Sequence, residues 1–310
     1  MVMEAMRTHP GDLTVQCHGC HVFAVLGRTP RARTLIFDAG GVEVVMDAMR
    51  KHPGDVAVQR HGCQVLALNR DGGANIVATG GVEVMMDAMY AHPGDAAVQG
   101  HGCRAFAALA SVHRGASAKL VEKGGVDVAI KAMRMHTGDA QVQSLGCHAL
   151  ITLLGRDERS KEILVDAGGV ELAVEAMRTH LADVSVQIAG CLALAVVGSR
   201  FDLHAEIVAA GGVEVAMEAM RKHPGEVAVQ GNGCRALAAL ATNIEEGKAK
   251  IVAGGGVEVV MDAMRMHPKD ASVQNYGSKV LVEGEATGPD APPAHKALLR
   301  RLGIAPHASG

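Results

Sequence analysis

Apolar residues follow a helical period along most of the chain. Val42, Val45, Met46 and Met49 recur at i, i+3, i+4 and i+7 within residues 42–52, and polar residues fill most of the positions between them. This spacing places the apolar side chains on one face, so the segment is predicted to be an amphipathic helix with one buried stripe. A His-Pro-Gly sequence ends the segment, because proline cannot continue a helix.

The same pattern repeats with a period of about 43 residues. Each repeat carries a glutamine: Gln16, Gln59, Gln99, Gln143, Gln187, Gln230 and Gln274. Four residues later stands a cysteine or, in the last repeat, a serine: Cys20, Cys63, Cys103, Cys147, Cys191, Cys234 and Ser278. A Gly-Gly pair opens at Gly40, Gly80, Gly124, Gly168, Gly211 and Gly255. One such unit cannot bury its apolar face alone, so neighbouring units are predicted to stack into a solenoid.

Each repeat is predicted to contain three helices. The short first helix ends at the Gly-Gly turn, as in residues 248–253, and the second is the amphipathic helix already described. The third helix runs over residues 227–241 in the clearest copy, and its predicted buried face holds Val229, Gly233, Ala236, Leu237 and Leu240. A predicted acidic N-cap precedes each third helix: Asp12, Asp55, Asp95, Asp139, Asp183, Glu226 and Asp270.

Composition narrows the classes of function. Aromatic residues make up only 2% of the chain and 48% of residues are hydrophobic, which excludes disorder and predicts a core of Ala, Val, Leu and Met. No stretch of about 18 residues is free of charge, so no membrane association is expected. The net charge of −3 gives no global basic field, so no nucleic-acid partner is expected either.

The seven cysteines favour an intracellular protein with reduced thiols, in the cytosol or the nucleus. The first residues lack the basic and apolar regions of a secretory signal, so secretion is not expected. Equivalent cysteines of stacked repeats should lie roughly 8–10 Å apart, beyond the ~7 Å reach of a disulfide. The recurring cysteine is therefore predicted to be a small buried residue.

Two features of the sequence resemble metal or haem sites. Cys17, Cys20 and His21 match the Cys-x-x-Cys-His spacing of haem attachment, and a Cys/His metal site at the N-terminus is kept as a remote alternative. The competing interpretation is that Cys20 is simply this repeat's copy of the recurring cysteine. A histidine also recurs before each turn, and it is predicted to cap helix carbonyls, because residues one repeat apart cannot share one metal. No cofactor and no metal are expected.

No catalytic constellation is present in the sequence. The Gly-rich turns follow helices and not strands, which excludes a phosphate-binding loop by context. Acidic residues of the second helices are predicted to pair with arginines one turn later: Asp47 with Arg50, Glu175 with Arg178, Glu218 with Arg221 and Asp262 with Arg265. The chain is therefore not expected to be an enzyme.

These repeats resemble the armadillo family. Residues 250–257, Gln230, Ala236–Leu237 and Leu240–Ala241 match its pattern closely, and the resemblance covers about residues 1–284. It implies an all-α, right-handed α-solenoid of about six full three-helix repeats plus a truncated N-terminal one. It also implies that the third helices line a concave groove, which in peptide-binding members holds an extended peptide.

One departure from the family affects the expected ligand. Peptide-binding members carry an asparagine nine residues after the glutamine, and this chain has no asparagine at those positions. The resemblance therefore implies a partner-binding groove without the usual capture of the peptide backbone. The candidate groove residues lie two and five positions after the glutamines: His18, His21, His61, Gln64, His101, Arg104, His148, Asn232, Arg235, Tyr276 and Lys279.

The expected function is a non-catalytic protein-interaction scaffold that binds a partner protein or an acidic peptide. Arg104, Arg235 and Lys279 are expected to hold its carboxylates, with affinity rising below about pH 6.5 as the histidines gain charge. The alternative is a structural fragment of a longer solenoid with no ligand of its own.

The ends differ from the repeats between them. Residues 1–27 form a partial repeat that is expected to expose an apolar edge with Met3 and Met6, so either upstream sequence is missing or this edge self-associates. Residues 285–310 are predicted to be a linker and a short amphipathic helix over 294–302, acting either as a cap or as a mobile tail.

Overall fold

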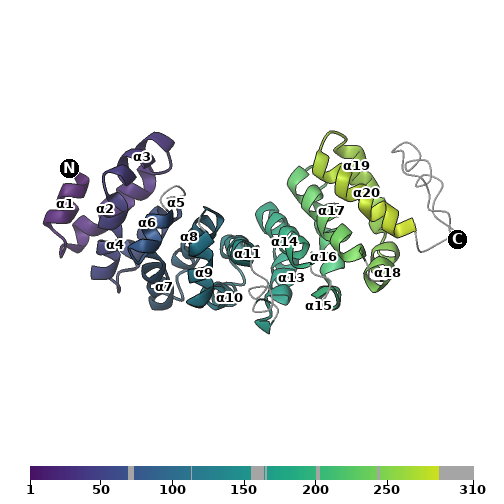
Figure 1. The fold of residues 1–310 in the computed structure, drawn as a ribbon, viewed down its shortest axis with the longest axis horizontal. Coiled ribbons are helices and arrows are strands. Elements are labelled where there is room, and N and C mark those ends of the chain that lie inside the picture. The colour runs from purple at the N-terminus through teal and green to yellow at the C-terminus, as the bar shows by residue number, and fades with distance from the viewer. Residues whose placement is uncertain are drawn as a thin grey trace. The chain divides into compact units, whose positions relative to one another are not determined.

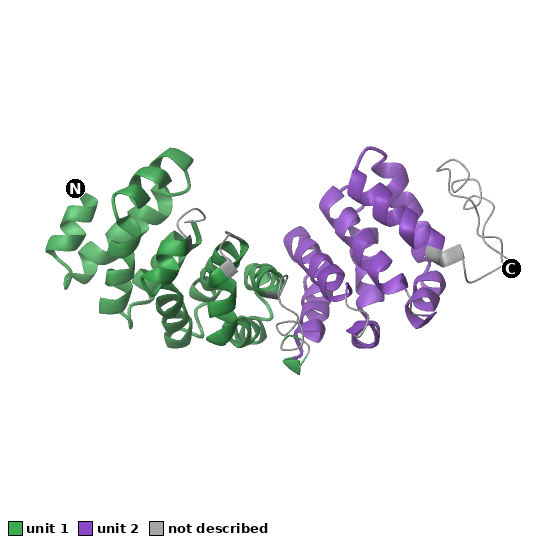
Figure 2. Ribbon diagram, in the orientation of Figure 1, with its two compact units in different colours: residues 1–167 green, residues 168–310 purple. Residues whose placement is uncertain are grey.

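The structure is a computed structural model, and it describes residues 1–68, 73–112, 114–154, 164, 166–199, 203–242 and 245–285. The described residues are helices joined by short turns (Figure 1). Contacts divide the chain into two compact units, residues 1–167 (unit 1) and residues 168–310 (unit 2), shown in separate colours in Figure 2. The predicted C-terminal helix over 294–302 lies outside the described residues, and the domain boundaries stay a prediction.

Unit 1 follows the predicted order of helices. Its helices are α1 Val2–Thr8, α2 Leu13–Leu26, α3 Pro30–Asp38, α4 Gly41–Lys51, α5 Val56–Leu68, α6 Gly73–Ala78, α7 Gly81–Ala91, α8 Ala96–Val112, α9 Arg114–Glu122, α10 Gly125–Met135 and α11 Ala140–Leu154. Second helices are α1, α4, α7 and α10, and third helices are α2, α5, α8 and α11. Three short first helices, α3, α6 and α9, connect them.

Unit 2 repeats the same plan. Its helices are α13 Gly169–Thr179, α14 Val184–Val197, α15 His204–Ala210, α16 Gly212–Lys222, α17 Val227–Ala241, α18 Glu245–Ala253, α19 Gly256–Met266 and α20 Ala271–Glu285. Second helices are α13, α16 and α19, and third helices are α14, α17 and α20. The all-α repeat fold expected from the sequence is confirmed.

The Gly-Gly turn needs both of its glycines for different reasons. Gly40, the first of its pair, has φ = 82°, a left-handed conformation that side-chain-bearing residues rarely adopt, and the first glycine of every later pair does the same. The second glycine, Gly41, lies so close to Ile36 that an added Cβ would be 2.4 Å from its side chain. The turn therefore brings the first and second helices into close contact.

A methionine–glycine contact joins the second and third helices of each repeat. A Cβ placed on Gly62 would lie 2.3 Å from the sulfur of Met49, and all seven repeats show the same overlap. The glycine before each recurring cysteine thus leaves room for a buried methionine. Every residue predicted on the buried stripes of α4 and α17 is buried, which confirms both helical patterns.

An acidic residue precedes every third helix as predicted, and all but one of these residues accept a capping hydrogen bond. Asp139 Oδ1 accepts a hydrogen bond from the Val142 backbone N–H at 2.9 Å, and five other aspartates make the equivalent bond. Glu226 makes no such side-chain bond. Its side chain is one methylene longer than that of aspartate, and this difference separates it from the six working caps.

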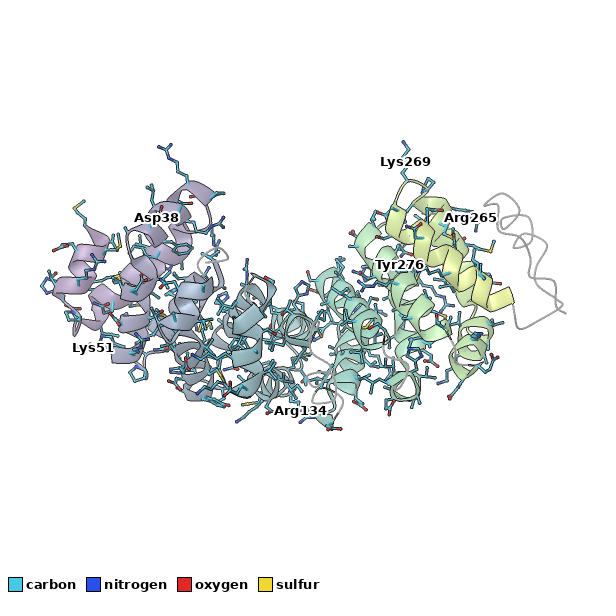
Figure 3. All side chains as sticks on the ribbon, in the orientation of Figure 1. Asp38, Lys51, Arg134, Arg265, Lys269 and Tyr276 are labelled. Atoms are coloured by element: carbon cyan, nitrogen blue, oxygen red, sulfur yellow. The ribbon has the colours of Figure 1, made fainter. Side chains whose placement is uncertain are left out.

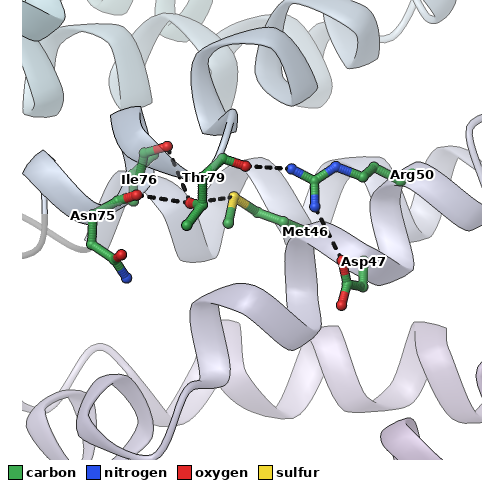
Figure 4. Close-up of polar contacts among 6 residues, drawn as sticks. All are labelled: Met46, Asp47, Arg50, Asn75, Ile76 and Thr79. Carbon is green, nitrogen blue, oxygen red and sulfur yellow. Dashed lines mark hydrogen bonds and ion pairs between the residues drawn. The ribbon is translucent and has the colours of Figure 1, made fainter.

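Two side chains of the second-helix region fasten neighbouring repeats together. The His136 Nε2–H donates to the Pro93 carbonyl of the preceding repeat at 2.8 Å, and His52, His92, His223 and His267 donate to the equivalent carbonyl. The Arg50 Nη2–H donates forward to the Thr79 carbonyl at 2.6 Å (Figure 4). The histidines therefore bond to the preceding repeat's turn and not to the end of their own helix.

The predicted ion pairs within the second helices form in two of four cases. Arg50 pairs with Asp47, and Arg265 pairs with Asp262. Arg178 and Arg221 instead donate to carbonyls of the next repeat, and neither pairs with a glutamate within the described part of the chain. The prediction of local pairs for these two arginines is wrong. Arg50 makes both bonds at once, so the carbonyl bond does not exclude a local pair; the two pairs that form use aspartates, and the two that fail would use glutamates.

The expectation of an apolar edge at Met3 and Met6 needs correction. Met6 is 2% exposed and packs on Gly19, so it belongs to the core of the first repeat. The exposed large apolar side chains of this end are instead Met1, Leu13, Val25, Leu26 and Leu35. Self-association through this repeat stays a prediction.

Candidate partner-binding face

The third helices pack against one another within each unit. In unit 1, α5 contacts α2 and α8, and α8 contacts α11; in unit 2, α17 contacts α14 and α20. Their side chains two and five positions after the recurring glutamines form what we call the third-helix face. The Figure 1 ribbon shows these helices as neighbouring rods in each unit.

The recurring glutamine fixes how each third helix is rotated. Gln143 is 1% exposed, and its Nε2 group donates to the Met133 and His136 carbonyls at the end of α10, both at 2.8 Å. The other six glutamines make the same two bonds. An α-helix turns about 100° per residue. The residues two and five positions after the buried glutamine therefore lie on the side of the third helix that faces away from this contact.

None of the candidate groove residues is buried. In unit 1 the exposed candidates are His18, His21, Arg104 and His148, and the half-buried ones are His61, Gln64 and His101. In unit 2 Lys279 is exposed, and Asn232, Arg235 and Tyr276 are half-buried. The structure therefore places the candidates in two groups, one in each unit.

Unit 1 gathers imidazoles and guanidinium groups across its first three third helices. The rings of His21 and His61 lie edge to face, with centroids 4.6 Å apart. Arg60 reaches from α5 to Asp95 at the start of the next third helix, with 2.7 Å between Nη2 and Oδ2. The Nδ1 atoms of His61 and His101 are buried and have no hydrogen-bond partner among the residues that the structure describes.

The histidines of this group are less basic than expected from the sequence. Burial, followed by the charge of Arg104, lowers the pKa of His101 to about 4. Burial is also the main cause that lowers the pKa of His61 and of His148. The expectation that imidazoles gain charge below about pH 6.5 therefore does not hold for His101, and the pKa values of His61 and His148 are lowered in the same direction.

Unit 2 places two cations near one aromatic ring. The Arg235 guanidinium lies 5.9 Å and the Lys279 ammonium 5.3 Å from the centre of the Tyr276 ring, which is labelled in Figure 3. Cation–π attraction of this kind contributes about 0.5–1 kcal/mol at exposed sites. It holds two positive charges next to a ring that can contact an apolar group.

The positions two and five after the glutamines leave out two positive residues of the unit 1 group. Arg60 and Arg28 both lie near enough to His101 to lower its pKa. Arg60 follows its glutamine directly, one turn before the Gln64 position, so helical spacing could have included it. Arg28 lies in the turn after α2, and no periodic signal marks it.

The Cys17, Cys20 and His21 motif lacks the geometry of a ligand set. Cys20 is fully buried, and burial raises the pKa of its thiol to about 12. Within the described ranges, no three His, Cys, Asp or Glu side chains converge in a way that could hold a metal ion. No helix among the described residues is long and apolar enough to cross a membrane.

Comparisons with known proteins point to one kind of fold. The sequence profile of the LRRK2 ARM repeat matches residues 118–281, more than half of the chain. An engineered protein solved by the Northeast Structural Genomics Consortium is 30% identical, with a TM-score of 0.76 over 98% of this chain and 72% of its own. A second engineered protein from that consortium is 26% identical, with a TM-score of 0.61 over 93% and 97% of the two chains.

A further likeness concerns the fold alone. A chain from a structure of the cadherin–beta-catenin interaction is 15% identical, with a TM-score of 0.76, and the match covers 98% of this chain and 55% of that one. No curated protein matches the chain. The helices and contacts define an α-solenoid repeat protein. The match to the ARM profile then shows that the chain belongs to the armadillo-repeat family.

Proposed function

We propose that the chain is a non-catalytic interaction scaffold whose third-helix face binds an acidic segment of a partner protein. A repeat solenoid supports an interaction role, because its stacked helices present an extended surface. The proposed setting is intracellular, in keeping with the free cysteines of both units.

The single observation that carries the proposal is the state of three cations. Arg104, Arg235 and Lys279 each lie on the third-helix face, and within the described ranges none of them forms an ion pair. Their charge is therefore available for charge-assisted hydrogen bonds to carboxylates. The absent asparagine positions argue against capture of peptide backbone, so binding should be modest and should weaken with salt.

The test is a charge swap with a matched control. Arg104→Glu together with Arg235→Glu should abolish binding to partners that the wild-type chain captures in a crosslinking pull-down. The control is Lys51→Glu with Lys222→Glu, which changes the net charge equally at exposed ends of second helices, one in each unit. Retention of partners at unchanged affinity by the first variant would exclude the third-helix face. Capture of no partner by the wild-type chain would favour the structural alternative.

A further inference from the structure

A pocket of about 270 Å³ lies in unit 2, away from the third-helix face. It is formed where α16 and α19, the second helices of neighbouring repeats, approach each other near their C-terminal ends. Its apolar lining includes Met220 and Ala263, which are buried, Val259, which is half-buried, and Met266, which is exposed. Met266 is 54% exposed, so the apolar wall continues to the surface.

The equivalent position in unit 1 is filled. Between α7 and α10 the corresponding space is only about 10 Å³. Positions in the two units can be matched by their distance from the recurring glutamine. By this count, Tyr90 of unit 1 corresponds to Arg221 of unit 2, and Lys131 corresponds to Asp262. Comparison of these two repeat pairs shows that the fold accommodates both an open and a nearly closed version of this space.

The rim of the open pocket carries one uncompensated positive charge. Arg265, labelled in Figure 3, is hydrogen-bonded to Asp262, so these two charges offset each other. Arg221 donates one hydrogen bond to the Gly254 carbonyl and, within the described part of unit 2, has no carboxylate partner. An arginine has five N–H donors, so Arg221 keeps donors for an anion.

The size of the pocket limits its ligand. The pocket volume is about 270 Å³. It falls just below the range of about 300–1,000 Å³ that is usual for drug-sized ligands. A ligand of this size has to combine an apolar group with a carboxylate in a small volume, and a C-terminal residue carries both.

We propose that this pocket binds the C-terminal residue of a partner peptide, with an apolar side chain against Met220, Val259 and Met266 and its α-carboxylate on Arg221. The bond is a charge-assisted one at the edge of an apolar surface. A ligand of one residue contacts little surface, so its dissociation constant should be millimolar. This site is independent of the proposed binding of an acidic segment by the third-helix face.

The test uses N-acetyl-phenylalanine as a mimic of a peptide C-terminus. Titration into protein labelled with ¹³C at the methionine methyl groups should shift the Met220 and Met266 signals with a saturable, millimolar curve. N-acetyl-phenylalaninamide has the same ring and no carboxylate, so it should bind about tenfold more weakly or worse. Equal binding of acid and amide, or no movement of these two signals, would overturn the proposal.

Variants copied from unit 1 locate the binding. Arg221→Tyr introduces the residue that stands at the equivalent position of unit 1 and removes the proposed carboxylate partner, so it should abolish the shifts. Arg178→Tyr is the matched control, because it makes the same change one repeat earlier in unit 2 and does not line the pocket. Helical circular dichroism checks that both variants fold. Shifts that survive in the first folded variant, or that vanish equally in the control, would contradict the assignment. Loss of this site would leave the third-helix face untouched, so the two proposals fail separately.

Discussion

Replacing Gln143 by methionine removes two hydrogen bonds from the end of a neighbouring helix while keeping a side chain of similar length. The Gln143 amide donates to the Met133 carbonyl and to the His136 carbonyl, each at 2.8 Å. The His136 carbonyl also accepts from the Asp139 backbone N–H, so it keeps one partner after the change. The Met133 carbonyl lies in the last turn of α10.

The expected cost follows from the two lost hydrogen bonds. Each contributes about 0.5–1.5 kcal/mol to stability. Together the change should lower the free energy of unfolding by about 1–3 kcal/mol. Urea unfolding followed by circular dichroism measures the total, and amide exchange should show the greatest loss of protection at the end of α10.

The matched control lies on the same helix. Gln141 is exposed two residues earlier, so Gln141→Met makes the same chemical change without touching either carbonyl. Its effect should stay within about 0.5 kcal/mol, as for other surface substitutions. If the two variants destabilise the protein equally, the glutamine does not cap the second helix and the argument for the orientation of the third helix is lost.

Two further predictions concern the buried thiols and the acidic caps. Burial raises the pKa of Cys147 to about 12 from an ordinary value of 9.0, so the folded state keeps a proton that the unfolded state loses above pH 9, and stability should fall as pH rises from about 9 to 12. Cys147→Ala should remove about 1.4 kcal/mol per pH unit from that slope in alkaline urea titrations, and an unchanged slope would contradict the burial of the thiol. Glu226→Asp should raise the free energy of unfolding by about 0.5–1 kcal/mol by creating the missing cap, and Asp270→Glu should lower it similarly. Thermal or urea unfolding checks both, and equal stability of aspartate and glutamate at the two positions would refute the role of the cap.

Local features of the fold could be predicted from the sequence because they depend on neighbours in the chain. The buried stripe of α4 and the left-handed Gly40 turn need only spacing and the properties of glycine. The aspartate caps were predictable for the same reason, since the bond joins residues three positions apart. Glu226 was grouped with the aspartates because of its charge, but its side chain is one methylene longer and makes no capping hydrogen bond.

Contacts between repeats could not be predicted from local spacing. Arg221 was assigned to a glutamate one turn away, but it reaches a carbonyl 33 residues along the chain. The glutamine was visible as a marker of the repeat, and its bonds to carbonyls seven and ten residues earlier needed the folded helix pair. Burial was missed too, both for Met6 and for the His101 imidazole, because exposure depends on what the neighbouring helices cover.

The most direct test of the proposed function is site-specific photo-crosslinking. A benzoyl-phenylalanine placed at His21 or Lys279 reports from the third-helix face of unit 1 or unit 2, and one placed at Lys51 or Lys222 reports from exposed ends of the second helices. In cell extract, the first pair of positions should crosslink to a common partner, through a segment rich in acidic residues, and high salt should weaken the crosslinks. Crosslinks that form at Lys51 or Lys222 and not at His21 or Lys279 would contradict the account.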